Sequence, residues 1–149
     1  MAETQIHIYL DNGQKVQFCS KPLWMKILSS KSIQIAFYPY VYLPDYQYHH
    51  QAIVYNTPIL HHKIQHIKQQ LKFNKWIWLF KYFTNKKFRL TMEAEAIAVE
   101  ILYTENIKRN AMLKIYAKKL CNYEYFWCAE SYYEAKKTIL EAFTRRARL

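Results

Sequence analysis

Glycine and long apolar runs are scarce in this sequence. With one glycine and four prolines in 149 residues, the chain cannot be collagen-like, a Gly/Ser linker or a protein with a glycine-rich nucleotide-binding loop. The most apolar window, residues 76–80, is flanked by lysines and is much shorter than the roughly 18 residues that a membrane span needs. The first residues contain no basic segment followed by an apolar one, so we expect neither a secretory signal nor a membrane span. Hydrophobic residues make up 52% of the chain, which excludes a disordered tail and predicts a soluble globular protein.

Cysteine and acidic residues are also few. Cys19, Cys121 and Cys128 have no CxxC spacing, so they predict neither a zinc knuckle nor a disulfide framework, and we expect reduced thiols. The 22 lysines and arginines outnumber 11 aspartates and glutamates, which gives a net charge of +11, and 17% of the residues are aromatic. A basic, aromatic surface suits nucleic acid, an acidic protein neighbour or a buried assembly interface. The alternative is the codon bias of an AT-rich genome.

The first half of the sequence carries the signals of short strands. Residues 5–10 and 15–19 alternate apolar and polar side chains on either side of Asn12-Gly13, which is typical of a β-hairpin. The tyrosine-rich segment 38–48 contains two prolines, which predict an extended loop or a sheet edge. Three more elements are predicted in this half: a short helix at 22–30 and strands at 33–37 and 52–55.

The second half carries the signals of helices. Thr57 and Pro58 are favourable first residues for a helix at 58–72, in which apolar side chains recur at helical spacing. An aromatic, basic connector is predicted at 75–89.

Thr91 is predicted to cap the next helix, which ends near Asn106. Its first turn would contain Glu93 and Glu95, where the helix dipole favours acidic side chains. Two later helices are predicted at 109–120 and at 132–144, the second opened by a capping box of Ser131 and Glu134. The sequence therefore predicts an α+β fold, with a small N-terminal antiparallel sheet or hairpin followed by a helical half, in a single domain over residues 1–149.

His62 and His66 are the candidate metal ligands. They lie four residues apart on the predicted helix, so both imidazoles project from one face, a spacing that lets two nitrogens hold one Zn²⁺. Such a site needs a third ligand, commonly a carboxylate, and Glu93 is the natural candidate, with Glu95 as the alternate. The alternative is that both histidines face inward and hydrogen-bond to Glu93 or to the backbone.

A family resemblance rests on the segments ILHHKIQHIKQ (59–69), 76–82 and FRLTMEAEA (88–96). Together they resemble zincin-type metallopeptidases with a glutamate as third ligand, and more narrowly a group of small peptidase-like proteins found among bacteriophage structural genes. Their pattern is a strand, an HExxH helix, an aromatic connector, and a second helix that opens with an arginine and ExxA. The match covers about residues 52–105. It implies a zincin-like topology, His62, His66 and Glu93 as metal ligands, and an orienting or capping role for Arg89.

The sequence departs from this pattern at the position that carries the chemistry. In an active site of this type, the residue after the first histidine is a glutamate that takes a proton from the attacking water. Here that residue is Lys63, and a protonated lysine cannot act as a general base. Ile97 is a second departure, because an acidic residue often follows the ExxA alanine in the family. The expectation is therefore a protein without catalytic activity and without a cofactor, with zinc as the metal to consider.

The resemblance implies a non-catalytic structural or assembly protein of a phage particle, found in the virion and assembled in the host cytoplasm. Its expected partners are other virion proteins, a second copy of the chain and, through non-specific contact, DNA. The first alternative is a zinc metallopeptidase that acts on cell-wall peptide or a virion precursor. The second alternative is a basic nucleic-acid-contacting protein, although no sequence-specific DNA-binding or RNA-binding motif is present.

Aromatic side chains beside lysines are the candidate contact residues, because tyrosine and tryptophan dominate interface energetics. The alternative is that the tryptophans pack in the core and the lysines form an ordinary solvated face. The candidates are Tyr38, Tyr40, Tyr42, Tyr46, Trp76, Trp78, Lys86 and Lys87.

Overall fold

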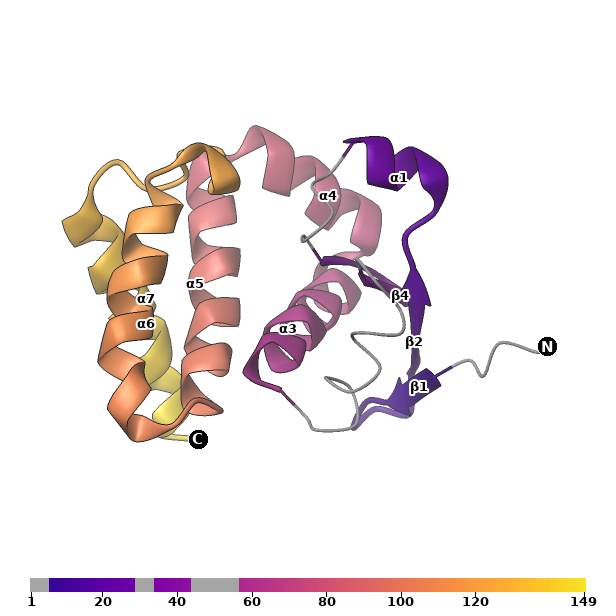
Figure 1. Cartoon of the computed structure of the whole chain (residues 1–149), viewed down its shortest axis with the longest axis horizontal. Coiled ribbons are helices and arrows are strands. Elements are labelled where there is room, and N and C mark those ends of the chain that lie inside the picture. The colour runs from indigo at the N-terminus through magenta and orange to yellow at the C-terminus, as the bar shows by residue number, and fades with distance from the viewer. Residues whose placement is uncertain (1–5, 29–33, 44–56) are drawn as a thin grey trace.

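An N-terminal four-stranded sheet is followed by a helical half, which confirms the predicted α+β fold (Figure 1). The computed structural model describes residues 6–28, 34–43 and 57–149. In Figure 1 the sheet lies at one end of the molecule and α6 and α7 at the other, with α3 and α5 between them.

The predicted hairpin is present. Strands β1 (Ile6–Tyr9) and β2 (Lys15–Ser20) pair antiparallel, and Gly13 adopts the positive φ of 79° that the turn requires. The full strand order is β1-β2-β4-β3, in which β3 (Ile35–Phe37) and β4 (Tyr40–Leu43) form a second antiparallel pair. Because β2 and β4 run parallel, the sheet is mixed and not purely antiparallel.

The prediction for segment 38–48 was wrong in its first part. Tyr40–Leu43 is neither a loop nor an edge strand but the inner strand β4, between β2 and β3. Pro39 precedes the strand, so its missing N–H leaves the ladder intact, and its carbonyl accepts a bond from the Gln17 amide at 2.8 Å. The predicted strand at 52–55 lies outside the described residues. The predicted short helix is present as α1 (Leu23–Leu28).

Helix α3 (Pro58–Phe73) covers one face of the sheet, as the spacing of its apolar residues predicts. Thr57 occupies the N-cap position, although its side chain makes no cap hydrogen bond. One hydrophobic core forms between the sheet and α3 and contains Leu10, Val16, Phe18, Val41, Leu43, Leu60 and Ile67.

The predicted connector 75–89 is a helix for most of its length. Helix α4 (Lys75–Thr84) has Asn74 as its N-cap, whose side chain accepts a hydrogen bond from the Trp76 amide. Asn85 then caps α5 (Lys86–Leu102) in the same way. The predicted cap Thr91 therefore lies inside α5, where its hydroxyl donates to the Lys87 carbonyl.

The last helices pack on the far side of α5. These are α6 (Asn106–Leu120) and α7 (Tyr132–Ala147), joined through the short 3-10 helix η1 (Tyr123–Tyr125). The predicted N-terminal cap of α7 is confirmed, since Ser131 accepts from the Glu134 amide at 3.1 Å. A second core forms here among α5, α6 and α7, with Ala98, Leu120 and Ile139 fully enclosed.

Candidate metal centre

Helix α3 places both predicted histidines on the face that packs against α5. The His62 and His66 side chains are buried, with 1% and 6% of their surfaces exposed. Their Nε2 atoms lie only 3.2 Å apart. The i, i+4 spacing on a regular helix is what brings the two rings together.

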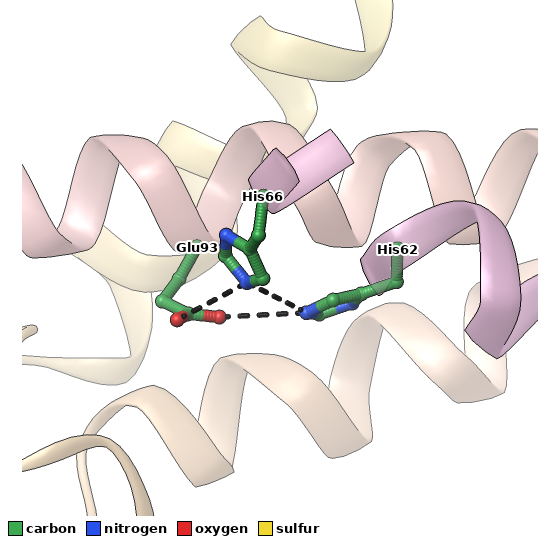
Figure 2. Close-up of side chains that lie close together, drawn as sticks. All are labelled: His62, His66 and Glu93. Carbon is green, nitrogen blue, oxygen red and sulfur yellow. Dashed lines mark hydrogen bonds and ion pairs between the residues drawn. The ribbon is translucent and has the colours of Figure 1, made fainter. Parts of the chain in front are cut away.

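Helix α5 supplies the third group. The Glu93 carboxylate meets both rings, with Oε2 at 3.6 Å from His62 Nε2 and Oε1 at 3.4 Å from His66 Nε2 (Figure 2). One ligand atom from each of the three side chains lies within 4.8 Å of the others. The three predicted ligands therefore come together as a buried cluster.

Glu93 lies on a buried stretch of α5 and is itself 3% exposed. Because α5 begins at Lys86, Glu93 lies in the middle of the helix and not in its first turn. The predicted dipole interaction of Glu93 and Glu95 with the start of a helix is therefore wrong, and Glu93 is buried for another reason.

The other ring nitrogen of His62 has a carboxylate partner. Nδ1 lies 2.8 Å from Oε2 of Glu100, which is about two helical turns after Glu93 on α5. Burial raises the pKa of Tyr116, so its hydroxyl keeps the proton and donates to both oxygens of Glu100 at 2.8 Å. Since the carboxylate of Glu100 is an acceptor, the Nδ1–H of His62 donates to it.

The other ring nitrogen of His66 has an amide partner. Its Nδ1 lies 3.0 Å from Gln69 Oε1. The orientation of the Gln69 amide is fixed, because its NH₂ group donates at 3.0 Å to both the Met92 carbonyl and Glu95 Oε2. Burial lowers the pKa of His66, so this imidazole is neutral with its proton on Nδ1.

Two ring nitrogens and one carboxylate consequently face one another. The two Nε2 atoms lie within hydrogen-bonding distance of each other, at 3.2 Å. On the carboxylate, Oε1 accepts a hydrogen bond from the Tyr82 hydroxyl, whose pKa is raised by burial. Oε2 has no hydrogen-bond partner among the described residues, although it is completely buried.

Glu93 is ionised in this environment. Burial alone would raise the pKa of its carboxyl group, but the two imidazoles outweigh burial and hold that pKa well below its ordinary value. A buried anion needs a neighbouring positive charge, which either a proton shared with the two imidazoles or a metal ion supplies. Two imidazoles and one carboxylate are a ligand set that suits Zn²⁺, and they leave the fourth tetrahedral position open.

The residues that depart from the family pattern lie beside this cluster. Lys63 is half-buried, and burial lowers the pKa of its amine, while the carboxylates of Glu93 and Glu100 oppose that shift. Ile97 is fully buried on α5 in the core with α6 and α7. Neither side chain supplies a carboxylate at the site.

Arg89 occupies a capping position, as the resemblance implies. Its guanidinium donates to the carbonyls of Tyr82 at 2.6 Å and Phe83 at 3.3 Å, at the end of α4, and to the carbonyl of Phe126 at 3.2 Å. The alternate ligand Glu95 points to Gln69 and is not part of the three-residue cluster.

The candidate contact residues are spread over two regions. Tyr38, Tyr40 and Tyr42 lie on or next to β4, and Tyr46 lies outside the described residues. Trp76, Lys86 and Lys87 are exposed. Trp78 is different: it is 5% exposed and stacks on Tyr82 with ring centroids 4.7 Å apart, so it belongs to the interior and not to a contact surface.

Sequence analysis did not find the partners that orient the ligands. Gln69, Tyr82, Glu100 and Tyr116 all contact a ligand or its direct partner. A helical signal for two of them was available, because Gln69 follows His66 by three residues and Glu100 follows Glu93 by seven. No local signal exists for Tyr82 and Tyr116, which come from other helices.

Comparison of the chain with protein-family models, curated proteins and solved structures finds no significant match. No helix in the described ranges is long and apolar enough to cross a membrane.

Proposed function

We propose that this protein binds one Zn²⁺ ion through His62, His66 and Glu93, in a zincin-like centre that does not hydrolyse peptides. The observation that supports the proposal is the convergence of two buried imidazoles and one buried carboxylate, whose ligand atoms lie within 4.8 Å of one another while the other polar atom of each side chain is already paired. In a buried hydrogen-bonded network each acceptor is normally paired with a donor, whereas Oε2 of Glu93 has no hydrogen-bond partner among the described residues and is available to a metal ion.

The groups around the ligands support the same interpretation. In zinc sites a ligating histidine normally donates its second N–H to a carboxylate or carbonyl, which fixes the ring and raises its basicity. Glu100 takes this role for His62, and Gln69 takes it for His66. When bound, the ion would supply a positive charge that neutralises Glu93 and links α3 to α5.

Lys63 supports the absence of hydrolysis. Water activation needs a base next to the metal, and the family pattern places a carboxylate there. The amine of Lys63 carries a positive charge when protonated and repels a cation in the neighbouring site. The centre is therefore a structural one in our proposal.

The wider role that we propose is that of a non-catalytic structural or assembly component of a phage particle. Its support is the resemblance of residues 52–105 to peptidase-like proteins encoded among phage structural genes. Such a role predicts that the protein co-purifies with intact particles and with another virion protein, and its absence from purified particles would contradict this part of the proposal.

Metal analysis of purified protein tests the centre. We expect one equivalent of zinc per chain in the wild type and less than a tenth of that in His62→Ala and His66→Ala. His61→Ala is the matched control, because His61 is the neighbouring histidine on α3, stacks on Tyr103 and lies outside the cluster. Full zinc retention by both cluster variants would contradict the proposal.

A peptidase assay tests the second half of the proposal. The zinc-loaded wild type should cleave neither casein nor cell-wall peptide, whereas Lys63→Glu restores the carboxylate of the family pattern and is the variant in which activity could emerge. Zinc-dependent cleavage by the wild type, abolished in His66→Ala, would replace this proposal with the metallopeptidase alternative.

A further inference from the structure

Helix α4 is apolar on both of its faces, and among the described residues only one of these faces is covered. Trp78 and Tyr82 point inward, where they stack on each other. On the other side, Trp76, Phe80 and Phe83 follow the i, i+4, i+7 spacing of a single stripe, and their exposed fractions are 62%, 69% and 58%. A helix that is hydrophobic all round is normally buried, so its exposed side is expected to meet another apolar phase.

A neighbouring turn extends the stripe. The rings of Phe83 and Phe126 are in contact, with centroids 6.0 Å apart, and Phe126 is itself half exposed. Phe126 and Trp127 have positive φ values of 53° and 46°, which bulky residues rarely adopt. The carbonyl of Phe126 is held by Arg89, so this strained turn is fixed next to the end of α4. We call Trp76, Ile77, Phe80, Phe83 and Phe126 the aromatic surface.

The charge along α4 and the start of α5 has one sign. No aspartate or glutamate occurs between Asp45 and Glu93, whereas this stretch contains eight lysines and arginines. Lys81, Lys86 and Lys87 are exposed at the end of α4 and the start of α5. A second copy of the chain placed against the aromatic surface would bring these lysines together, and the net charge of +11 would oppose that contact.

We propose that the aromatic surface lies on an anionic lipid bilayer, with α4 parallel to the membrane plane. Tryptophan and phenylalanine on one face, with a lysine rim, are the features of helices that bind at the boundary between headgroups and acyl chains. The stripe of Trp76, Phe80 and Phe83 projects from α4, and Phe126 extends it from the neighbouring turn, which suits insertion among lipids. The lysines contribute attraction to anionic headgroups. This surface lies on a different face of α4 from Tyr82, so the inference does not rest on the proposed metal centre.

Vesicle flotation tests this inference on the full chain. The probes are vesicles of pure phosphatidylcholine and vesicles of phosphatidylcholine with phosphatidylglycerol at a ratio of about three to one. We expect at least tenfold tighter binding to the anionic vesicles, with a blue shift of tryptophan fluorescence as Trp76 leaves water.

Two sets of variants separate the apolar and the charged contributions. Ile77→Ser with Phe80→Ser should weaken binding to anionic vesicles at least tenfold, since both side chains are exposed and their loss leaves the interior intact. Lys81→Gln with Lys86→Gln and Lys87→Gln should remove most of the preference for anionic vesicles. The matched control is Ile107→Ser with Tyr133→Ser, which removes two even more exposed apolar side chains from α6 and α7 and should bind as the wild type does.

Circular dichroism establishes whether each variant is folded. If Ile77→Ser with Phe80→Ser does not fold, the lysine variants still test the inference. Three outcomes would overturn the inference: no binding to either vesicle, equal loss in the control pair, or a wild-type oligomer that Ile77→Ser with Phe80→Ser disperses while vesicle binding is absent. The last result would assign the aromatic surface to a second copy of the chain.

Discussion

At the scale of single residues, Glu93 separates a metal site from an ordinary buried ion pair. If the cluster is a structural network that depends on the negative charge of Glu93, neutralising this residue should destabilise the protein whether or not zinc is present. If the cluster is a metal site, the metal-free protein contains a buried carboxylate oxygen without a hydrogen-bond partner among the described residues, and its stability should not depend on that charge.

The substitution Glu93→Gln distinguishes these cases. A glutamine can still accept from the Tyr82 hydroxyl, and its NH₂ group can donate to His62 Nε2 in place of the unpaired Oε2. We therefore expect the metal-free variant to melt at or above the temperature of the metal-free wild type. Zinc at 100 times its dissociation constant should stabilise the wild type by about 2.7 kcal/mol and the variant by almost nothing.

Calorimetry with chelator and with excess zinc measures both quantities. Glu141→Gln, an exposed substitution on α7, is the control and should behave as the wild type in both conditions. A metal-free Glu93→Gln that melts well below the metal-free wild type would favour the structural network.

Glu100 affects the proposed metal centre only through its hydrogen bond with His62. Glu100→Gln keeps the shape of the side chain but removes the charge that orients and polarises the imidazole, so zinc affinity should fall by about 10- to 100-fold. Competition titration with a zinc indicator measures this change. Tyr116→Phe, which removes the donor to Glu100 but not the carboxylate, should cause a smaller loss of affinity. Equal zinc affinity in Glu100→Gln and the wild type would show that the contact does not support a metal ligand.

At the scale of elements, the junction between α3 and α4 depends on Asn74. This residue has φ 67° and ψ 127°, a conformation that favours glycine, and its side chain also caps α4. Asn74→Ala loses the cap and keeps the strain, so it should destabilise the protein by about 1–2 kcal/mol. Asn74→Gly relieves the strain and should cost clearly less. Urea unfolding of both variants checks the order, and a greater loss in the glycine variant would contradict this account of the junction.

Elements with a strong local signal were predictable from the sequence. The Asn12-Gly13 turn fixed the hairpin, and the Ser131 cap fixed the start of α7. Helix α4 was missed because its aromatic side chains are apolar on both faces, which removes the periodicity that normally marks a helix. The start of α5 was misplaced because Thr91 and Asn85 are both good caps, and only tertiary packing decides between them.

The candidate site was also predictable only in part. The spacing of His62 and His66 and the family pattern around Glu93 brought out the three clustered residues. The rest of the site was not predictable, because Tyr82 and Tyr116 reach the ligand set from α4 and α6 through packing that no sequence period encodes.

At the scale of the whole molecule, the net charge of +11 has a measurable consequence. Any affinity of the protein for DNA should arise from contacts to phosphates and should be independent of base sequence. We expect binding of a 30-base-pair duplex to weaken at least tenfold between about 50 and 200 mM salt, and to be equal for two unrelated sequences. Fluorescence anisotropy measures both. An affinity that is unchanged across this salt range would exclude charge as its origin.

The position of the histidine–glutamate cluster between two helices also affects how the molecule unfolds. Helix α3 contributes Leu60 and Ile67 to the core with the sheet, while α5 contributes Ala98 and Ile101 to the core with α6 and α7. A divalent ion held between these two helices would couple two hydrophobic cores that are otherwise built from separate stretches of chain. The cooperativity of thermal unfolding should then depend on whether the metal is bound. The zinc-loaded protein should unfold in a single transition, and the protein stripped of metal by a chelator should unfold in two transitions that overlap only partly.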